Sequence, residues 1–140
     1  MSDTKRILVT GATGKVGQAF IRRLLSDRNF DGFVVRALCH NRKLEATDRI
    51  EVVTGSIQHR EVADQAVAGV THVLHLATTK ETPETIMDVA VKGMFWLLEA
   101  CRTSPVFRQF ILVGGSTGQN ISGVLRFLAP DATPLGLDKP

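Results

Sequence analysis

Three glycines spaced three residues apart follow an apolar run near the start of the chain. The segment Thr10-Gly11-Ala12-Thr13-Gly14-Lys15-Val16-Gly17 begins where Ile7-Leu8-Val9 ends. Gly11 suits a tight turn, Gly14 has no side chain to keep a pyrophosphate from the main chain, and Gly17 allows close helix–strand packing. A helix beginning here directs unpaired N–H groups and the positive end of its dipole at a bound anion. The pattern therefore predicts a phosphate-binding loop.

The spacing of this loop is weak support when taken alone. It reads GxxGxxG, one residue longer than the GxGxxG fingerprint, and the chain contains 12 glycines. A glycine-rich strand-to-helix turn without a ligand is the alternative interpretation. The apolar run before the loop and the amphipathic pattern after it favour the ligand-binding interpretation, because a dinucleotide loop joins a strand to a helix.

The elements that must position this loop are those of an alternating α/β chain. Helical patterns are expected at about 15–28, 60–68 and 82–102, and Thr82 and Pro83 mark the start of the last one. In the first helix, Val16, Phe20 and Leu24 share one face with Gly17, Ile21 and Leu25. Strands are expected at Arg6–Thr10, Phe33–Cys39, Ile50–Thr54, Val70–Leu76 and Phe110–Val113.

This alternation predicts an α/β fold with a doubly wound parallel sheet, Rossmann-like, in the strand order 3-2-1-4-5. The ligand is then expected at the switch point between the first and fourth strands. We expect one binding domain over residues 1–118, truncated after about the fifth strand, and an irregular tail over residues 119–140 that is rich in proline and glycine.

Length and composition exclude several classes of protein. A chain of 140 residues fits one domain and leaves no room for a separate substrate domain. An apolar share of 44% and a charged share of 22% are typical of ordinary soluble domains. No apolar run is long enough to span a bilayer, and the first residues do not form a signal peptide. We therefore expect a cytoplasmic protein with no membrane contact.

The basic balance and the cysteines point to no additional ligand. The net charge is +3, but the basic residues are dispersed, and seven Phe, one Trp and no Tyr offer no base-stacking platform. We expect a solvated basic surface and no nucleic-acid partner. Cys39 and Cys101 show no CxxC spacing and no histidine cluster, so we expect buried, reduced thiols and no metal site.

The residues after the second predicted strand bear on the choice of cofactor. In a dinucleotide-binding fold, an acid at this place accepts from the ribose hydroxyl of NAD, whereas basic groups accommodate the 2′-phosphate of NADP. His40-Asn41-Arg42-Lys43 offers basic groups and no acid. The sequence therefore favours NADP. NAD remains the alternative, since a short basic loop can simply be solvated.

Several segments together resemble the extended or atypical short-chain dehydrogenases/reductases, also called the NAD-dependent epimerase/dehydratase family. The loop at 10–17 looks like the family's TGATGxxG motif, and 35–41 resembles the end of its second strand. Gly55-Ser56-Ile57 stands where the family has Gly-Asp-Leu, His75-Leu76-Ala77 matches its HLA segment, and 91–100 is similar to its NVxGTxNLLEA helix.

The resemblance implies a set of cofactor-binding residues and three departures from the family pattern. Ser56 replaces the Asp that contacts adenine, His40 stands where NADP-preferring relatives often have Arg, and Ala90 replaces an Asn. The residues expected to bind the cofactor are Gly11, Thr13, Gly14, Lys15, Val16, Gly17, His40, Asn41, Arg42, Ser56, Ile57, Leu76, Ala77 and Thr78.

Catalytic residues are harder to find. The family's acid/base is the Tyr of a YxxxK motif, and this chain contains no Tyr. Its substrate-orienting Ser aligns with Gly115, so Ser116 serves only if the loop shifts by one residue. His59, His72 and His75 have no recognisable nucleophile partner, and His75 on a central strand is expected to be a packed core residue.

Three interpretations follow. The chain is the cofactor-binding part of an oxidoreductase or epimerase that acts on a nucleotide sugar or small carbonyl compound and cannot transfer hydride alone. Alternatively, it is a non-catalytic, NADP-sensing regulatory protein. A third interpretation is a truncated product that exposes a sheet edge and apolar surface, which favours a homodimer or aggregation.

Overall fold

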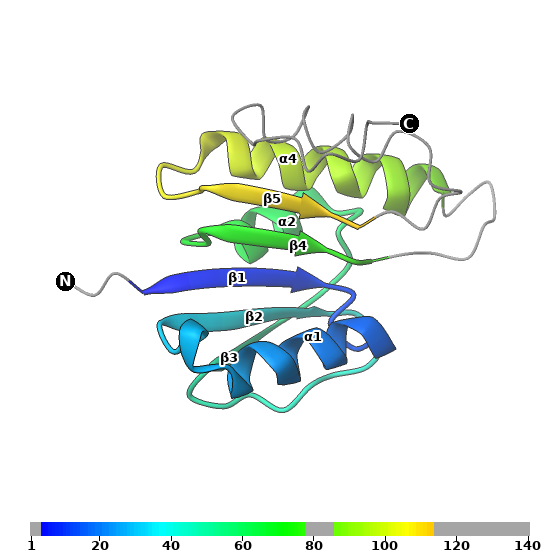
Figure 1. Ribbon diagram of the computed structural model, residues 1–140. Helices are drawn as coiled ribbons and strands as arrows, with labels where there is room; N and C mark the ends of the chain where they lie inside the picture. The colour runs from blue at the N-terminus through cyan, green and yellow to red at the C-terminus, as the bar shows by residue number, and fades with distance from the viewer. Residues whose placement is uncertain (1–3, 78–85, 114–140) are drawn as a thin grey trace, which may run out of the picture.

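The computed structural model describes residues 4–77 and 86–113, which form a five-stranded sheet flanked by helices (Figure 1). The strands are β1 (Lys5–Thr10), β2 (Phe33–Cys39), β3 (Ile50–Thr54), β4 (His72–His75) and β5 (Gln109–Leu112). All neighbouring pairs are parallel, and the order is β3-β2-β1-β4-β5. The predicted α/β class, parallel sheet and strand order are confirmed.

The helices cover both faces of the sheet. α1 (Lys15–Ser26) and the short 3₁₀ helix η1 (Arg28–Phe30) follow β1, and α2 (Arg60–Val67) follows β3. The connection between β4 and β5 contains η2 (Ile86–Gly93), wound as a π-helix, and then α4 (Met94–Thr103). Figure 1 shows α1 on one face and α2 and α4 on the other. This arrangement is what parallel strands with helical crossovers require.

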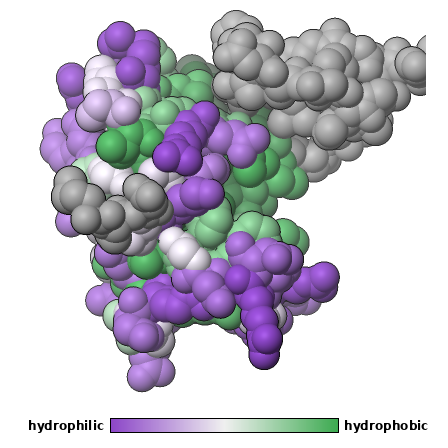
Figure 2. Space-filling view, turned by 60° about the vertical axis from the view of Figure 1, so that its left-hand side comes forward, coloured by the Kyte–Doolittle hydropathy of each residue, from purple (hydrophilic) through white to green (hydrophobic). Residues whose placement is uncertain are grey.

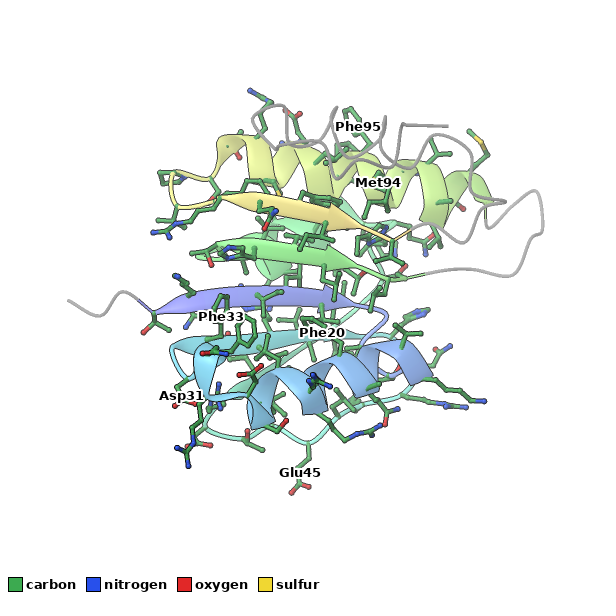
Figure 3. All side chains as sticks on the ribbon, viewed as in Figure 1. Phe20, Asp31, Phe33, Glu45, Met94 and Phe95 are labelled. Atoms are coloured by element: carbon green, nitrogen blue, oxygen red, sulfur yellow. The ribbon has the colours of Figure 1, made fainter. Side chains whose placement is uncertain are left out.

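Each face of the sheet has its own apolar core because side chains alternate along every strand. Leu8, Val73 and Phe110 face α2 and α4, where they pack with Leu97 and Cys101. On the other face, Ile7, Val9, Val35, Leu74, Ile21 and Leu24 are buried together. Figure 3 shows Phe20 and Phe33 lying between α1 and the sheet.

Two details of the helices differ from the sequence prediction. The side chain of Val16 is 66% exposed rather than part of the buried face, because the first turn of α1 projects past the end of β1 (Figure 1). The segment Ile86–Gly93 is wound as a π-helix where an α-helix was expected. In it, Val89 packs against the core and Ala90 is exposed. The predicted start of this helix at Thr82 lies outside the described residues.

The described surface is mixed in character. Figure 2 shows hydrophilic residues interspersed with smaller hydrophobic areas on the side where β1 begins. Cys39 and Cys101 are buried and free, as expected, and burial raises the pKa of the Cys101 thiol to about 12. Within residues 4–77 and 86–113, no helix has the length and apolar character needed to cross a membrane. The predicted tail at 119–140 lies outside the described residues.

Candidate functional site

Two of the three loop glycines are required by the chain itself. Gly11 has a φ of 67°, and a Cβ there would lie 2.9 Å from the backbone nitrogen of Ala77. A Cβ on Gly17 would lie 2.3 Å from the carbonyl oxygen of Gly11. Gly11 therefore lets the turn after β1 pass against the end of β4, and Gly17 lets α1 pack against that turn.

Gly14 differs from the other two glycines. Its backbone is extended, with φ −75° and ψ 169°, which any residue can adopt. Among the atoms of the described residues, a Cβ on Gly14 would meet only the Gly11 carbonyl oxygen, at 3.4 Å. The described part of the chain would accept a side chain at this position, so packing gives no reason for a glycine. The space beside Gly14 suits a group that must approach the backbone closely, as a pyrophosphate does.

The amino-terminal end of α1 offers donors at the same place. The first helical hydrogen bond runs from Gln18 N–H to the Gly14 carbonyl, at 2.9 Å, so the preceding N–H groups have no partner within the helix. Gly14 caps the helix without a side-chain bond, and the first turn contains no acidic residue. Gln18 Nε2 donates to the Thr13 carbonyl at 2.7 Å and ties the loop to the helix. This combination suits an anion.

The segments after β2 and β3 contribute different groups. His40, Asn41 and Arg42 directly follow β2, and all three are exposed. Ser56 is partly buried after β3, whereas the side chain of Ile57 is buried. A Cβ on Gly93 would lie 2.6 Å from Ile57 Cδ1, so this side chain packs against the start of α4. What Ile57 can offer a ligand is therefore its backbone.

At the end of β4, backbone groups are held by a residue of β1. The N–H groups of Leu76 and Ala77 both donate to Thr10 Oγ1, each at 3.0 Å. The same oxygen lies 2.7 Å from His75 Nδ1. His75 is buried as the sequence predicted, and burial lowers its pKa to about 4. No role for Thr10 is predicted from the sequence; the one local signal is a hydroxyl side chain at the last position of a buried strand.

The structure thus brings most of the expected residues to one edge of the sheet. Carboxyl ends of parallel strands share an edge, and here β1, β2, β3 and β4 lead into the glycine loop and the segments 40–42, 56–57 and 76–77 (Figure 1). The chain reverses its direction of winding between β1 and β4, which is where ligands bind in such folds. Thr78 and Ser116 lie outside the described residues.

Comparisons with known proteins agree with this geometry. A sequence model of the NAD dependent epimerase/dehydratase family matches residues 7–119. Tetraketide alpha-pyrone reductase 1 of Arabidopsis thaliana is 27% identical over 80% of this chain and 38% of its own length. Dihydroflavonol 4-reductase of Zea mays is 25% identical over 86% of this chain and 37% of its own length. The chain therefore spans little more than a third of these relatives.

Solved structures show the same fold. The uronate dehydrogenase of Agrobacterium tumefaciens superposes with a TM-score of 0.70 at 24% identity, over 84% of this chain and 42% of that protein. A short-chain dehydrogenase/reductase superfamily protein from the same organism, with bound NAD, has a TM-score of 0.59 at 32% identity. The match covers 76% of this chain and 31% of that protein. The family match covers the strands, the loop and the helices described above, and the chain belongs to the NAD-dependent epimerase/dehydratase family.

Proposed function

We propose that this chain binds a nicotinamide dinucleotide, with the pyrophosphate beside Gly14 and the first turn of α1. The observation that carries the proposal is the contrast among the loop glycines. Gly11 and Gly17 are required by internal packing, but within residues 4–77 and 86–113 a Cβ on Gly14 would have a single contact, at 3.4 Å from a carbonyl oxygen. A ligand that approaches the backbone explains this glycine. The NAD bound to a superfamily protein of 32% identity supports the same ligand class.

We further propose a preference for NADP over NAD. Arg42 and His40 are exposed directly after β2, and Lys43 follows them. A 2′-phosphate there would gain charge-assisted hydrogen bonds. The same segment has no acidic side chain to accept from a free ribose hydroxyl.

In the first proposed role, the chain supplies the cofactor-binding part of an oxidoreductase or epimerase acting on a small carbonyl compound or nucleotide sugar. The chain contains no Tyr, so it lacks the proton donor that the family resemblance implies, and Ser116 alone does not replace it. The missing Tyr also favours the second role, a non-catalytic NADP sensor. We place either role in the cytoplasm, which the two free thiols support.

Calorimetric titration with NADP⁺, NADPH, NAD⁺ and NADH tests the proposed ligand. We expect binding with the tighter affinity for the NADP forms. Gly14→Val should abolish binding because its side chain fills the space proposed for the pyrophosphate. Gly32→Val is the matched control, since a Cβ on Gly32 meets no atom of the described part of the chain within 4 Å. No binding by the unchanged chain, or equal binding by both variants, would contradict the proposal.

The two roles are separated by turnover and assembly. A cofactor-binding part should bind NADPH without oxidising it in the presence of small aldehydes and ketones, and its oligomeric state should not respond to the cofactor. A sensor should change its oligomeric state or its association with a partner when NADP⁺ or NADPH is added. Sedimentation velocity with and without each dinucleotide distinguishes these outcomes.

We also propose a homodimer formed through an apolar stripe, defined as Met87, Val91 and Phe95. Their side chains are 58%, 50% and 56% exposed, and they recur every fourth residue along η2 and α4. Around a two-fold axis at Val91, Met87 of one copy meets Phe95 of the other, a favourable sulfur–aromatic contact. Figure 3 shows Phe95 projecting from α4 away from the sheet, whereas Met94 lies on the sheet side.

Charged residues beside the apolar stripe also favour a second copy of this chain as the partner. Lys92 and Asp88 lie 3.8 Å apart within one copy, and each directly follows a residue of the stripe. An antiparallel pairing about Val91 brings Lys92 of one copy within reach of Asp88 of the other. Opposite charges that meet across a two-fold axis favour a second copy of this chain as the partner.

A further inference from the structure

We propose that His75 is a positioning residue for the dinucleotide crevice, held by the Thr10 hydroxyl as the neutral tautomer that carries its proton on Nε2. The assignment of the tautomer follows from hydrogen bonds within the chain. Only the step from the tautomer to ligand binding rests on the proposed function.

The hydrogen-bonding capacity of the Thr10 hydroxyl decides the direction of the contact. A threonine hydroxyl has one proton to donate and two lone pairs to accept with. The N–H groups of Leu76 and Ala77 donate to Thr10 Oγ1, both at 3.0 Å, and occupy both lone pairs. Among the described residues, the remaining neighbour is His75 Nδ1, at 2.7 Å, and the hydroxyl proton goes to it. Nδ1 is therefore the acceptor and carries no proton.

The state of the His75 ring follows from this direction. With Nδ1 unprotonated, the neutral ring carries its proton on Nε2. A proton on Nδ1 would point at an oxygen whose lone pairs are already taken, so one backbone N–H would lose its partner. Such a loss is costly for a buried donor, and the His75 side chain is only 4% exposed. The ring thus keeps Nδ1 as an acceptor for the Thr10 hydroxyl.

The groups positioned by this contact lie where the proposed ligand would lie. Thr10 and His75 are the last Cα partners in the register between β1 and β4. The Leu76 and Ala77 backbone directly beyond them packs against Gly11, where a Cβ would come within 2.9 Å of the Ala77 nitrogen. One hydroxyl therefore fixes the end of β4 against the glycine loop. His75 sets the orientation of that hydroxyl.

The tautomer can be measured on the unchanged chain without any ligand. In ¹⁵N-labelled protein, long-range ¹H–¹⁵N spectra distinguish a bare ring nitrogen from a protonated one. We expect His75 to show a bare Nδ1 and a protonated Nε2, unchanged between pH 6 and pH 8. The exposed His59 provides a reference signal in the same spectrum. A protonated Nδ1 on His75, or titration of His75 within this range, would overturn the inference.

Variants connect the tautomer to binding. Thr10→Val keeps the shape but removes the hydroxyl, and we expect NADP⁺ affinity to fall about tenfold or more, since two backbone donors lose their acceptor. Thr10→Ser restores the hydroxyl and should restore both the affinity and the Nε2–H tautomer. His75→Phe keeps a buried ring without an acceptor, and its affinity should fall as well. Unchanged affinity in Thr10→Val or in His75→Phe would overturn the positioning role.

Failure of this inference is distinguishable from failure of the proposed function. If the unchanged chain binds no dinucleotide, the proposed function is wrong, and the spectra alone then decide the tautomer. If Thr10→Val does not fold, the comparison of His75→Phe with the unchanged chain decides the positioning role.

Discussion

The loop glycines show how residues of one type are under different constraints. Gly17 packs its Cα against the Gly11 turn so closely that a methyl group would lie 2.3 Å from a carbonyl oxygen. Gly14 has no such neighbour within the described residues, and its nearest contact would be 3.4 Å away. Stability should therefore depend on Gly17, whereas ligand binding should depend on Gly14.

Replacing Gly17 tests the first half of this distinction. Gly17→Ala forces backbone atoms apart, and such overpacking costs about 1–3 kcal/mol, partly offset by the higher helix propensity of alanine. Urea denaturation should show this loss. Gly14→Ala is the matched variant and should cost less, because its Cβ forces no atoms apart and the variant only exchanges glycine for a poorer N-cap residue. Equal stability of the two variants would show that α1 is not held closely against the loop.

Arg42 carries the prediction about cofactor choice. Arg42→Glu should weaken NADP⁺ binding by about tenfold or more, because a charge-assisted hydrogen bond to phosphate contributes roughly 1.5–3 kcal/mol. Affinity for NAD⁺ should stay the same or rise, since the new acid can accept from the ribose hydroxyl. Arg28→Glu provides the control in calorimetric titration, because Arg28 is an exposed arginine of η1, beyond the carboxyl end of α1. A uniform loss for both dinucleotides would contradict a 2′-phosphate contact.

At the scale of elements, an ion pair network ties three strands to one helix. Glu51 on β3 accepts from Arg36 on β2 at 3.1 Å and from Arg6 on β1 at 2.9 Å. Arg36 also donates to the carbonyls of Ala66 and Ala68 at the end of α2, at 2.8 and 2.7 Å. The arginine therefore satisfies carbonyl groups that the helix end leaves without partners.

Because of this network, the stability of the folded chain depends on pH. Burial alone raises the pKa of Glu51, but hydrogen bonds from Arg36 and Arg6 outweigh burial and hold that pKa below its usual value. A carboxyl whose pKa is lower in the folded than in the unfolded chain stabilises the folded state. This stabilisation is fully present at pH values above the pKa of the same carboxyl in the unfolded chain. This stabilisation disappears as pH falls through the folded-state value.

Glu51→Gln tests this dependence. The variant should unfold more easily than the unchanged chain at pH 7, by at most about 1 kcal/mol because Glu51 is partly exposed. The difference should shrink as pH falls from 5 to 3, as urea denaturation at each pH would show. Glu45→Gln is the control, because Figure 3 shows Glu45 projecting away from the sheet and helices. A difference that stays constant down to pH 3 would mean that the ionised Glu51 carboxylate is not responsible.

For the whole molecule, the apolar stripe makes the oligomeric state testable. Val91→Glu should convert the proposed dimer to a monomer, because it places like charges on both sides of the two-fold axis. Val106→Glu changes an equally apolar side chain of similar exposure, 47% against 50%, away from the stripe and should have no effect. Sedimentation equilibrium measures both variants. An unchanged chain that is monomeric, or a dimer that survives Val91→Glu, would contradict this interface.

Local sequence determined the architecture. The apolar runs of the strands, the helical periods and the glycine spacing each depend on residues within about one element, and together they predicted the α/β class and the order β3-β2-β1-β4-β5. The roles of Gly11 and Gly17 were predictable for the same reason. Turn geometry and close packing require glycine whatever else the fold contains.

Only the tertiary structure decided which polar groups meet at the crevice. Thr10 and His75 are 65 residues apart in the chain, and no local pattern indicates that their side chains share a hydrogen bond. The burial of Ile57 against Gly93 depends likewise on the docking of α4. Periodicity predicts which face of an element is buried. Contacts between distant elements determine which side chain meets which.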